Sequence, residues 1–299
     1  MIENLFVPVV TPFDGDGRID VEALVAHCHW TTARGAEGVV LFGTTGEGPS
    51  LSVTEKVDTA RTLTATMPGI PVIAAVTENS ITDTEHCLHR YNNVGLAAVL
   101  VLPPFYFREQ PTDGLHAFYA RTLTCSDHPM LAYHIPGLAP AVPLSVTAEL
   151  PVWGVKDSGD DLTYTGAVLE TGKQVMTGSE RLIARGTEIG ATGAIAAMGN
   201  LLPGQLARVC TAARAGASKD AQHELDAVLT LQAAITDVAP GLEWIAATKQ
   251  IAAHLHGTGL GTVRLPLLQR RDYLTPRIRK LLDRHAGDPS SHQSPELLP

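Results

Sequence analysis

Residues 38–76 read GVVLFGTTGEGPSLSVTEKVDTARTLTATMPGIPVIAAV and contain the unit from which the rest of the chain is built. Two short and almost wholly apolar runs, Gly38–Gly43 and Ile70–Val76, flank an amphipathic segment at Thr54–Met67. Apolar runs without polar alternation are typical of parallel strands that are covered on both faces. The sequence SVTE at 52–55 is a capping pattern at the start of the helix. The stretch therefore predicts strand, helix and strand.

The same alternation recurs roughly every 20 to 30 residues from the N-terminus to about residue 217. The expected strands are Leu5–Thr11, Gly38–Gly43, Ile70–Val76, Ala97–Leu102, Met130–His134, Val152–Lys156, Gln174–Gly178 and Gly193–Ala197. The clearest intervening helices are Asp20–Arg34, Thr54–Met67, Ile81–Asn93, Thr112–Ser126 and Pro203–Ala215. Eight strand–helix repeats predict an α/β fold of the (β/α)8 TIM barrel type. A doubly wound sheet would have fewer repeats and a dinucleotide fingerprint, which the sequence lacks.

Beyond residue 217 the strand pattern stops, and three helical stretches follow: Ala221–Val238, Gly241–His256 and Pro266–Leu282. We therefore expect a catalytic barrel at 1–217 and a C-terminal helical domain at 218–285. Residues 286–299 are rich in proline and serine, and we expect them to be a disordered tail.

Composition excludes several classes of function. The net charge of the 299 residues is −9 and the basic residues are scattered, so nucleic acid is not an expected partner. No apolar run reaches the roughly 18 residues of a membrane span, and the N-terminus lacks the pattern of a signal peptide. The four cysteines lie far apart and form no CxxC pair, so we expect buried free thiols in a reducing cytoplasm.

Catalytic groups of such barrels lie at the C-terminal ends of the strands. Of the six lysines, Lys156 alone ends an apolar strand, VWGVK, at a predicted pocket. Desolvation there would lower its pKa and leave a neutral amine, which can attack a ketone and form an imine. The structural alternative is that Lys156 pairs with a barrel acid such as Asp157.

Two neighbouring strand ends could complete this site. Tyr133 ends the strand before Lys156, and its phenol could move protons as the imine forms, although it could equally be a packing residue. The sequence GTTGE at 43–47 follows the second strand, where two hydroxyls and exposed backbone N–H groups could bind a carboxylate.

Metal and cofactor sites are not expected. The pairs His27/His29 and His254/His256 are spaced i, i+2 and face apart on a helix, and we interpret them with His86 and His89 as solvated surface residues. A nucleophile elbow, a P-loop and a pyridoxal phosphate site are absent.

Four motifs in order, GTTGE at 43–47, PPFY at 103–106, YHIP at 133–136 and GVKDS at 154–158, resemble the dihydrodipicolinate synthase / N-acetylneuraminate lyase family. The resemblance covers roughly residues 2–215. It implies a pyruvate-dependent class I aldolase on a barrel with a C-terminal helical domain, with no cofactor besides the lysine imine. It also implies a homotetramer.

The resemblance implies roles for individual residues. Lys156 matches the imine-forming lysine and Tyr133 the proton-shuttling tyrosine, while Thr44 and Thr45 match the pair that holds the proton relay and the pyruvate carboxylate. Tyr106 resembles a relay tyrosine that is lent across a subunit interface. The other expected substrate-binding positions are Gly43, Gly46, Gly178 and Ile195.

The sequence departs from the family pattern in the region that would bind the second substrate. His134 stands where the family usually has Asn, and Leu138 stands where true dihydrodipicolinate synthases carry an arginine for a carboxylate. The sequence Ser179-Glu180-Arg181 lacks the acidic pair of sialic acid lyases. Arg181 or Arg108 could fold in to replace the missing cation.

The sequence therefore predicts a Schiff-base-forming lyase that joins pyruvate to an aldehyde or releases it. The acceptor is unassigned, and a 2-keto-3-deoxy sugar acid type is one option. The alternatives are a decarboxylating keto-deoxy sugar acid dehydratase, a true 4-hydroxy-tetrahydrodipicolinate synthase, and a non-enzymatic relic that binds 2-oxo acids.

Overall fold

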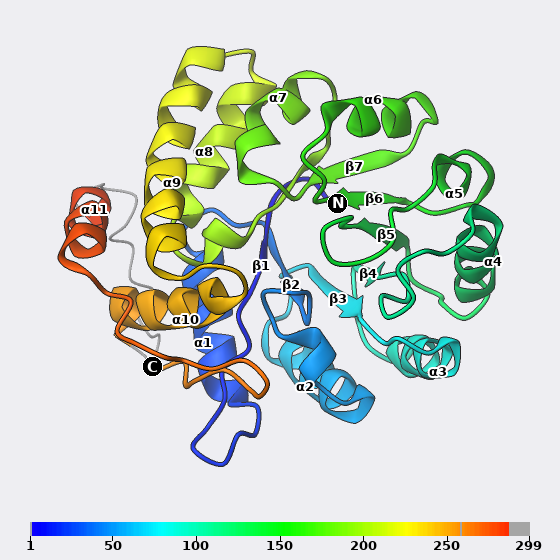
Figure 1. The fold of residues 1–299 in the computed structure, drawn as a ribbon, viewed down its shortest axis with the longest axis horizontal. Helices are drawn as coiled ribbons and strands as arrows, with labels where there is room; N and C mark the ends of the chain where they lie inside the picture. The colour runs from blue at the N-terminus through cyan, green and yellow to red at the C-terminus, as the bar shows by residue number, and fades with distance from the viewer. Residues whose placement is uncertain (1, 258, 287–299) are drawn as a thin grey trace.

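The computed structural model describes residues 2–257 and 259–286. Eight parallel strands close into a barrel in sequence order, with β1 paired to both β2 and β8 (Figure 1). The strands are β1 (Asn4–Pro8), β2 (Gly38–Leu41), β3 (Val72–Val76), β4 (Ala98–Val101), β5 (Met130–His134), β6 (Gly154–Asp157), β7 (Gln174–Thr177) and β8 (Gly193–Ile195). The predicted TIM barrel is confirmed, and most observed strands are one or two residues shorter than the apolar runs.

A ring of helices surrounds the strands (Figure 1). It comprises α1 (Val21–Thr32), α2 (Val53–Thr66), α3 (Ile81–Tyr91), α4 (Thr112–Leu123), α5 (Leu144–Glu149), α6 (Leu162–Glu170), α7 (Ile183–Glu188) and α8 (Pro203–Arg214). The predicted capping box is present, since Ser52 accepts from the Glu55 N–H and the Glu55 carboxylate accepts from the Ser52 N–H. No ranges were predicted for helices α5 to α7, because each is too short to display a helical period.

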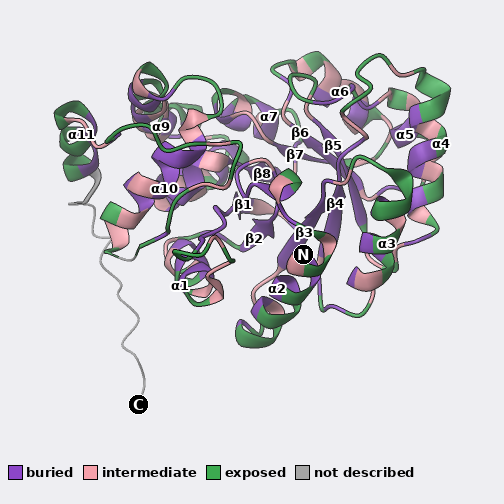
Figure 2. Ribbon diagram, turned by 60° about the horizontal axis from the view of Figure 1, so that its bottom comes forward, coloured by how far each residue is buried: buried purple, intermediate pink, exposed green. Residues whose placement is uncertain are grey.

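The strands separate two hydrophobic cores. Alternate side chains point inward and fill the barrel, including Phe6, Ile73 and Leu131. The others point outward and pack against the helices. Figure 2 shows the strands almost wholly buried and the outer helices exposed on their far sides. Tyr133 belongs to the inward-pointing set, so its side chain points toward the barrel axis.

Three helices follow the barrel: α9 (Ser218–Val238), α10 (Glu243–His256) and α11 (Pro276–Ala286). Helix α9 packs against α8, and α10 lies at the side of the barrel beside α1 (Figure 1). The prediction of a helix at Pro266–Leu282 was wrong in its first part. The helix begins at Pro276, because proline suits the first helical position. Residues 266–275 are not helical. The expected disordered tail lies outside the described residues except for Ala286, which ends α11.

Two expectations about buried groups have different outcomes. All four cysteines are buried free thiols, as predicted, and burial raises the pKa of Cys28, Cys87 and Cys210. His27, however, is fully buried rather than a surface residue, because its Nε2 bonds the Asn200 side chain at 2.8 Å. None of the described helices combines the length and apolar character needed to cross a membrane.

Candidate active site

The register of two neighbouring strands creates the centre of the site. Tyr133 on β5 is paired directly with Lys156 on β6, so both side chains point into the barrel at the same level. Lys156 Nζ donates a hydrogen bond to Tyr133 Oη at 3.1 Å and lies 4.3 Å from the centre of the Tyr133 ring. Both residues are buried. The predicted proximity of these two side chains is confirmed.

Thr44 extends this pair into a chain of three polar groups. Its hydroxyl lies 3.3 Å from Tyr133 Oη, and either oxygen can donate. Burial would raise the pKa of Tyr133, but the positive charge of Lys156 and hydrogen bonds with Thr44, Lys156 and Ser158 outweigh burial and lower it. A phenol with a lowered pKa, placed between an amine and a hydroxyl, is suited to moving protons between them.

The loop that carries Thr44 has a strained backbone. Phe42 and Glu47 both have positive φ angles, of 60° and 54°, at the two ends of the GTTGE turn. A bulky residue in this left-handed region costs about 1–3 kcal/mol and is retained only where its surroundings hold it. Gly46 is buried inside the turn, where a Cβ would lie 2.9 Å from the Phe42 nitrogen.

A buried ion pair between Glu47 and Lys249 fixes the position of the same loop. Glu47 Oε1 lies 2.5 Å from Lys249 Nζ, and both side chains are almost fully buried. The other oxygen, Oε2, accepts the Arg264 backbone N–H at 2.8 Å. Burial lowers the pKa of Lys249 to about 8 although Glu47 opposes the shift. The C-terminal helices therefore fix the position of the turn beside Lys156.

A cavity of about 500 Å³ opens above the Lys156–Tyr133 pair. Thr44, Thr45, Gly178 and Ile195 line it, as expected. A Cβ at Gly178 would lie 2.1 Å from the Ser158 hydroxyl oxygen, so a larger residue would have to displace the Ser158 side chain. Gly43 and Gly46, which were expected to bind substrate, are not among the lining residues and instead shape the turn.

Tyr106 lies outside this cavity and is 75% exposed. The neighbouring Phe107 is also exposed, and the two rings are in edge-to-face contact. The backbone N–H groups of Phe105 and Tyr106 both donate to Asn79 Oδ1, which fixes the loop. The expected role of Tyr106 in a neighbouring subunit's site stays a prediction.

The sequence did not predict the contacts of the His134 side chain. Its ring stacks on Tyr164, with centroids 3.8 Å apart, and its Nδ1 accepts the Val142 N–H at 3.1 Å. Burial lowers the pKa of His134 to about 4. The neutral ring therefore joins the two ends of loop 135–142. This loop places Leu138 in the lining of the cavity.

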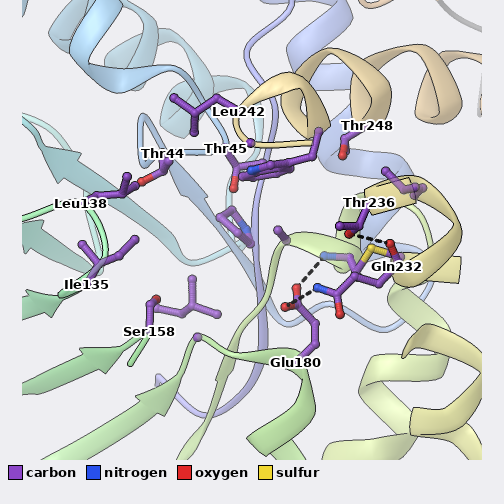
Figure 3. A pocket seen from close by; sticks show the side chains of 18 of the residues that line it. Thr44, Thr45, Ile135, Leu138, Ser158, Glu180, Gln232, Thr236, Leu242 and Thr248 are labelled. Atoms are coloured by element: carbon purple, nitrogen blue, oxygen red, sulfur yellow. Dashed lines mark hydrogen bonds between the residues drawn. The ribbon is translucent and has the colours of Figure 1, made fainter. Parts of the chain in front are cut away.

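The sequence reasoning missed much of the cavity wall. Helices α9 and α10 contribute side chains on the side opposite Ile135 and Leu138, including Gln232, Thr236 and Thr248 (Figure 3). Glu180 is also buried there, and its two oxygens accept from the Met198 N–H and the Gln232 amide, each at 3.1 Å. Helical periodicity predicted these helices but contained no information about which face would reach the barrel.

Neither arginine that could have replaced the missing cation lines the cavity. The Arg181 guanidinium pairs with Asp160, and that of Arg108 donates to the Pro136 and Gly137 carbonyls at 3.3 Å. Within residues 2–257 and 259–286, no group of three or more His, Cys, Asp or Glu residues is arranged to hold a metal ion.

Comparisons with known proteins agree with this geometry. Residues 1–284 match the model of the Dihydrodipicolinate synthetase family. An uncharacterized DapA-like lyase of Chloroflexus aurantiacus is 32% identical, over 76% of this chain and 84% of its own. A 4-hydroxy-tetrahydrodipicolinate synthase of Corynebacterium diphtheriae is 30% identical, over 89% of this chain and 88% of its own.

Solved structures share the fold. A dihydrodipicolinate synthase of Bacillus anthracis superposes with a TM-score of 0.86 at 23% identity, over 95% of this chain and 98% of that one. The KD(P)GA structure from T. tenax gives 0.85 at 25% identity, with the same coverage. The chain therefore belongs to the dihydrodipicolinate synthetase family and is a lyase of the class I aldolase type.

Proposed function

We propose that this lyase joins pyruvate to an aldehyde, or releases it, through an imine on Lys156. The observation that carries the proposal is the chain of contacts from Lys156 to Tyr133 to Thr44 at a cavity of about 500 Å³. The alternative pairing with Asp157 is disfavoured. The Asp157 carboxylate bonds the Gly159 N–H and the Thr165 hydroxyl, and Lys156 points the other way, into the barrel.

The proposed steps use the residues of this chain alone. The Lys156 amine adds to the keto carbon of pyruvate, and loss of water gives a protonated imine that accepts electrons. A proton then leaves C3, and the resulting enamine forms a carbon–carbon bond to the aldehyde carbon, whose oxygen takes a proton. Hydrolysis releases the product and restores the amine. Tyr133 acts as general acid and base, and Thr45 helps to hold the carboxylate.

A borohydride experiment tests this proposal. Reduction in the presence of pyruvate should add one adduct per chain, and peptide mapping should locate it on Lys156. Lys156→Ala should abolish the adduct and turnover, whereas Lys173→Ala should change neither because Lys173 lies at the opposite end of the barrel beside β7. An adduct on another lysine, or turnover that survives without any adduct, would refute the imine mechanism.

We further infer an oligomer, with a tetramer as the expectation, in which Tyr106 reaches a neighbouring site. The support is the pair Tyr106 and Phe107, which stay 75% and 69% exposed on a loop that Asn79 fixes. Sedimentation of the native chain at working concentration checks this, and a fully active monomer would contradict it. Four free thiols support a reducing, cytoplasmic location.

We also infer that the chain is not an efficient 4-hydroxy-tetrahydrodipicolinate synthase. Leu138 lines the cavity where an arginine would hold the carboxylate of the second substrate, and leucine has neither charge nor donor. With aspartate semialdehyde we expect a kcat/KM below the usual lower limit of about 10⁴ M⁻¹s⁻¹. A value within the ordinary enzymatic range would contradict this inference.

A further inference from the structure

The outer part of the cavity, above the Lys156–Tyr133 pair, is where an aldehyde would have to lie. Its wall is mainly apolar. Ile135 and Leu138 come from the loop after β5 (Figure 3), Met198 from the short helix after β8, and Leu242 and Trp244 from the start of α10. Three different segments of the chain thus present apolar side chains to the same space.

Two polar side chains of this outer part, Glu180 and Thr236, already make hydrogen bonds within the protein. Glu180 accepts two hydrogen bonds, from the Met198 N–H and the Gln232 amide. The Thr236 hydroxyl donates to the Gln232 carbonyl within its own helix at 3.0 Å (Figure 3). A polyhydroxylated substrate would have to share these groups with their present partners, and each buried hydroxyl left unpaired costs free energy.

The charges of the cavity also select against an acid. Lys156 is the single basic side chain that lines it in the described part of the chain, and the imine consumes that amine. Glu180 supplies a carboxyl group to the same wall. Lys249 is near in space but is buried against Glu47 behind the GTTGE turn. An acceptor with a carboxylate would therefore be desolvated without a partner.

We propose that the acceptor is an uncharged aldehyde whose body beyond the carbonyl is apolar, either aliphatic or aromatic. This rests on the proposed imine at Lys156, since the inner part of the cavity is then occupied by pyruvate. The cavity volume of about 500 Å³ leaves room for such a body and falls within the range of small-molecule sites.

Three aldehydes of equal carbon number separate the possibilities: butanal, succinic semialdehyde and erythrose. With pyruvate as donor, we expect kcat/KM for butanal to exceed that for each of the other two by at least about tenfold, the effect of a contact of about 1.4 kcal/mol. Benzaldehyde should also be accepted. Succinic semialdehyde or erythrose equal to butanal, or better, would overturn the proposal.

A matched pair of variants tests whether the wall sets this preference. Leu138→Arg should raise the ratio of succinic semialdehyde to butanal activity at least about tenfold, because it adds a carboxylate partner. Leu144→Arg is the control, since Leu144 has the same 42% exposure but does not line the cavity. It should leave the ratio unchanged. Equal ratios in the two variants would show that Leu138 does not determine specificity.

The borohydride adduct separates failure of this inference from failure of the proposed function. A chain that forms the Lys156 adduct with pyruvate but turns over erythrose or succinic semialdehyde, and not butanal, is a lyase with a different acceptor. A chain that forms no adduct overturns the imine mechanism and the acceptor assignment together.

Discussion

At the scale of single residues, the site depends on one phenol between two other polar groups. Tyr133 is held by Lys156 at 3.1 Å and by Thr44 at 3.3 Å, and the net effect of its surroundings lowers its pKa. Because the hydroxyl has contacts on both sides, it can pass a proton without moving. Its burial keeps water from competing for that role.

Tyr133→Phe should lower kcat by about 10²- to 10⁴-fold, the usual effect of losing an acid–base group. The ring stays in place and only the hydroxyl is lost, so pyruvate binding, measured by calorimetry, should change far less. Steady-state kinetics with pyruvate and an accepted aldehyde provide the measurement. As a control, Tyr164→Phe removes a hydroxyl that bonds the Val142 carbonyl at 2.9 Å, outside the proton relay. Similar losses of kcat in both variants would contradict the assignment of Tyr133.

At the scale of elements, α10 supports the loop that follows β2. Lys249 on α10 bonds Glu47 of the GTTGE turn and also donates to the Thr262 carbonyl at 2.7 Å. Its ammonium lies 4.2 Å from the centre of the Phe13 ring. The strained turn that carries Thr44 and Thr45 is thus connected to the C-terminal helices through one buried charge.

Lys249→Met should lower the free energy of unfolding by about 3–5 kcal/mol, because Glu47 would be left buried without its counter-ion. Urea denaturation measures this. The double variant with Glu47→Gln should recover part of the loss, since the amide oxygen can still accept the Arg264 N–H. Arg277→Ala removes an ion pair with Asp237 in which both side chains are 60% exposed, and it should cost less than about 1 kcal/mol. Equal losses at the buried and exposed pairs would contradict this account.

At the scale of the whole molecule, two buried histidines and a half-buried one should make the fold sensitive to acid. His27 on α1, His134 at the end of β5 and His256 on α10 each have a pKa lowered to about 4, with burial as the main cause. In the unfolded chain they titrate near 6.5. The unfolded state therefore binds more protons between these values. The contribution of the histidines to stability is present above pH 6.5 and is lost as the pH falls toward 4.

His27→Gln should flatten this loss, because an amide can still donate to Asn200 but does not titrate. The part of the loss due to His27 is about 3 kcal/mol, because folding lowers its pKa to about 4. Thermal unfolding at a series of pH values between 7 and 4 measures it. His29→Gln, two residues away on the exposed side of α1, should keep the pH dependence of the parent chain. Identical profiles for both variants would argue against His27 as the acid-sensitive group.

The amino-acid sequence by itself determined the barrel and the centre of its site. Each apolar run and each helical period is encoded within about 20 residues, and the end of a parallel strand is known once the strand is known. Lys156 and Tyr133 could therefore be placed together from the sequence, and the register of β5 and β6 confirms it. Local patterns also predicted the capping box at Ser52 and Glu55.

Only the tertiary structure decided which residues line the cavity around Lys156 and Tyr133, and which residues hold the GTTGE turn in place. Gln232, Thr236 and Trp244 reach the cavity because α9 and α10 dock over the barrel mouth, and that docking depends on contacts between residues far apart in the chain. For the same reason the partners of Glu47, His27 and His134 could not be predicted. A helical period states which face of a helix is apolar, but the surface against which the face packs is set by the assembled fold.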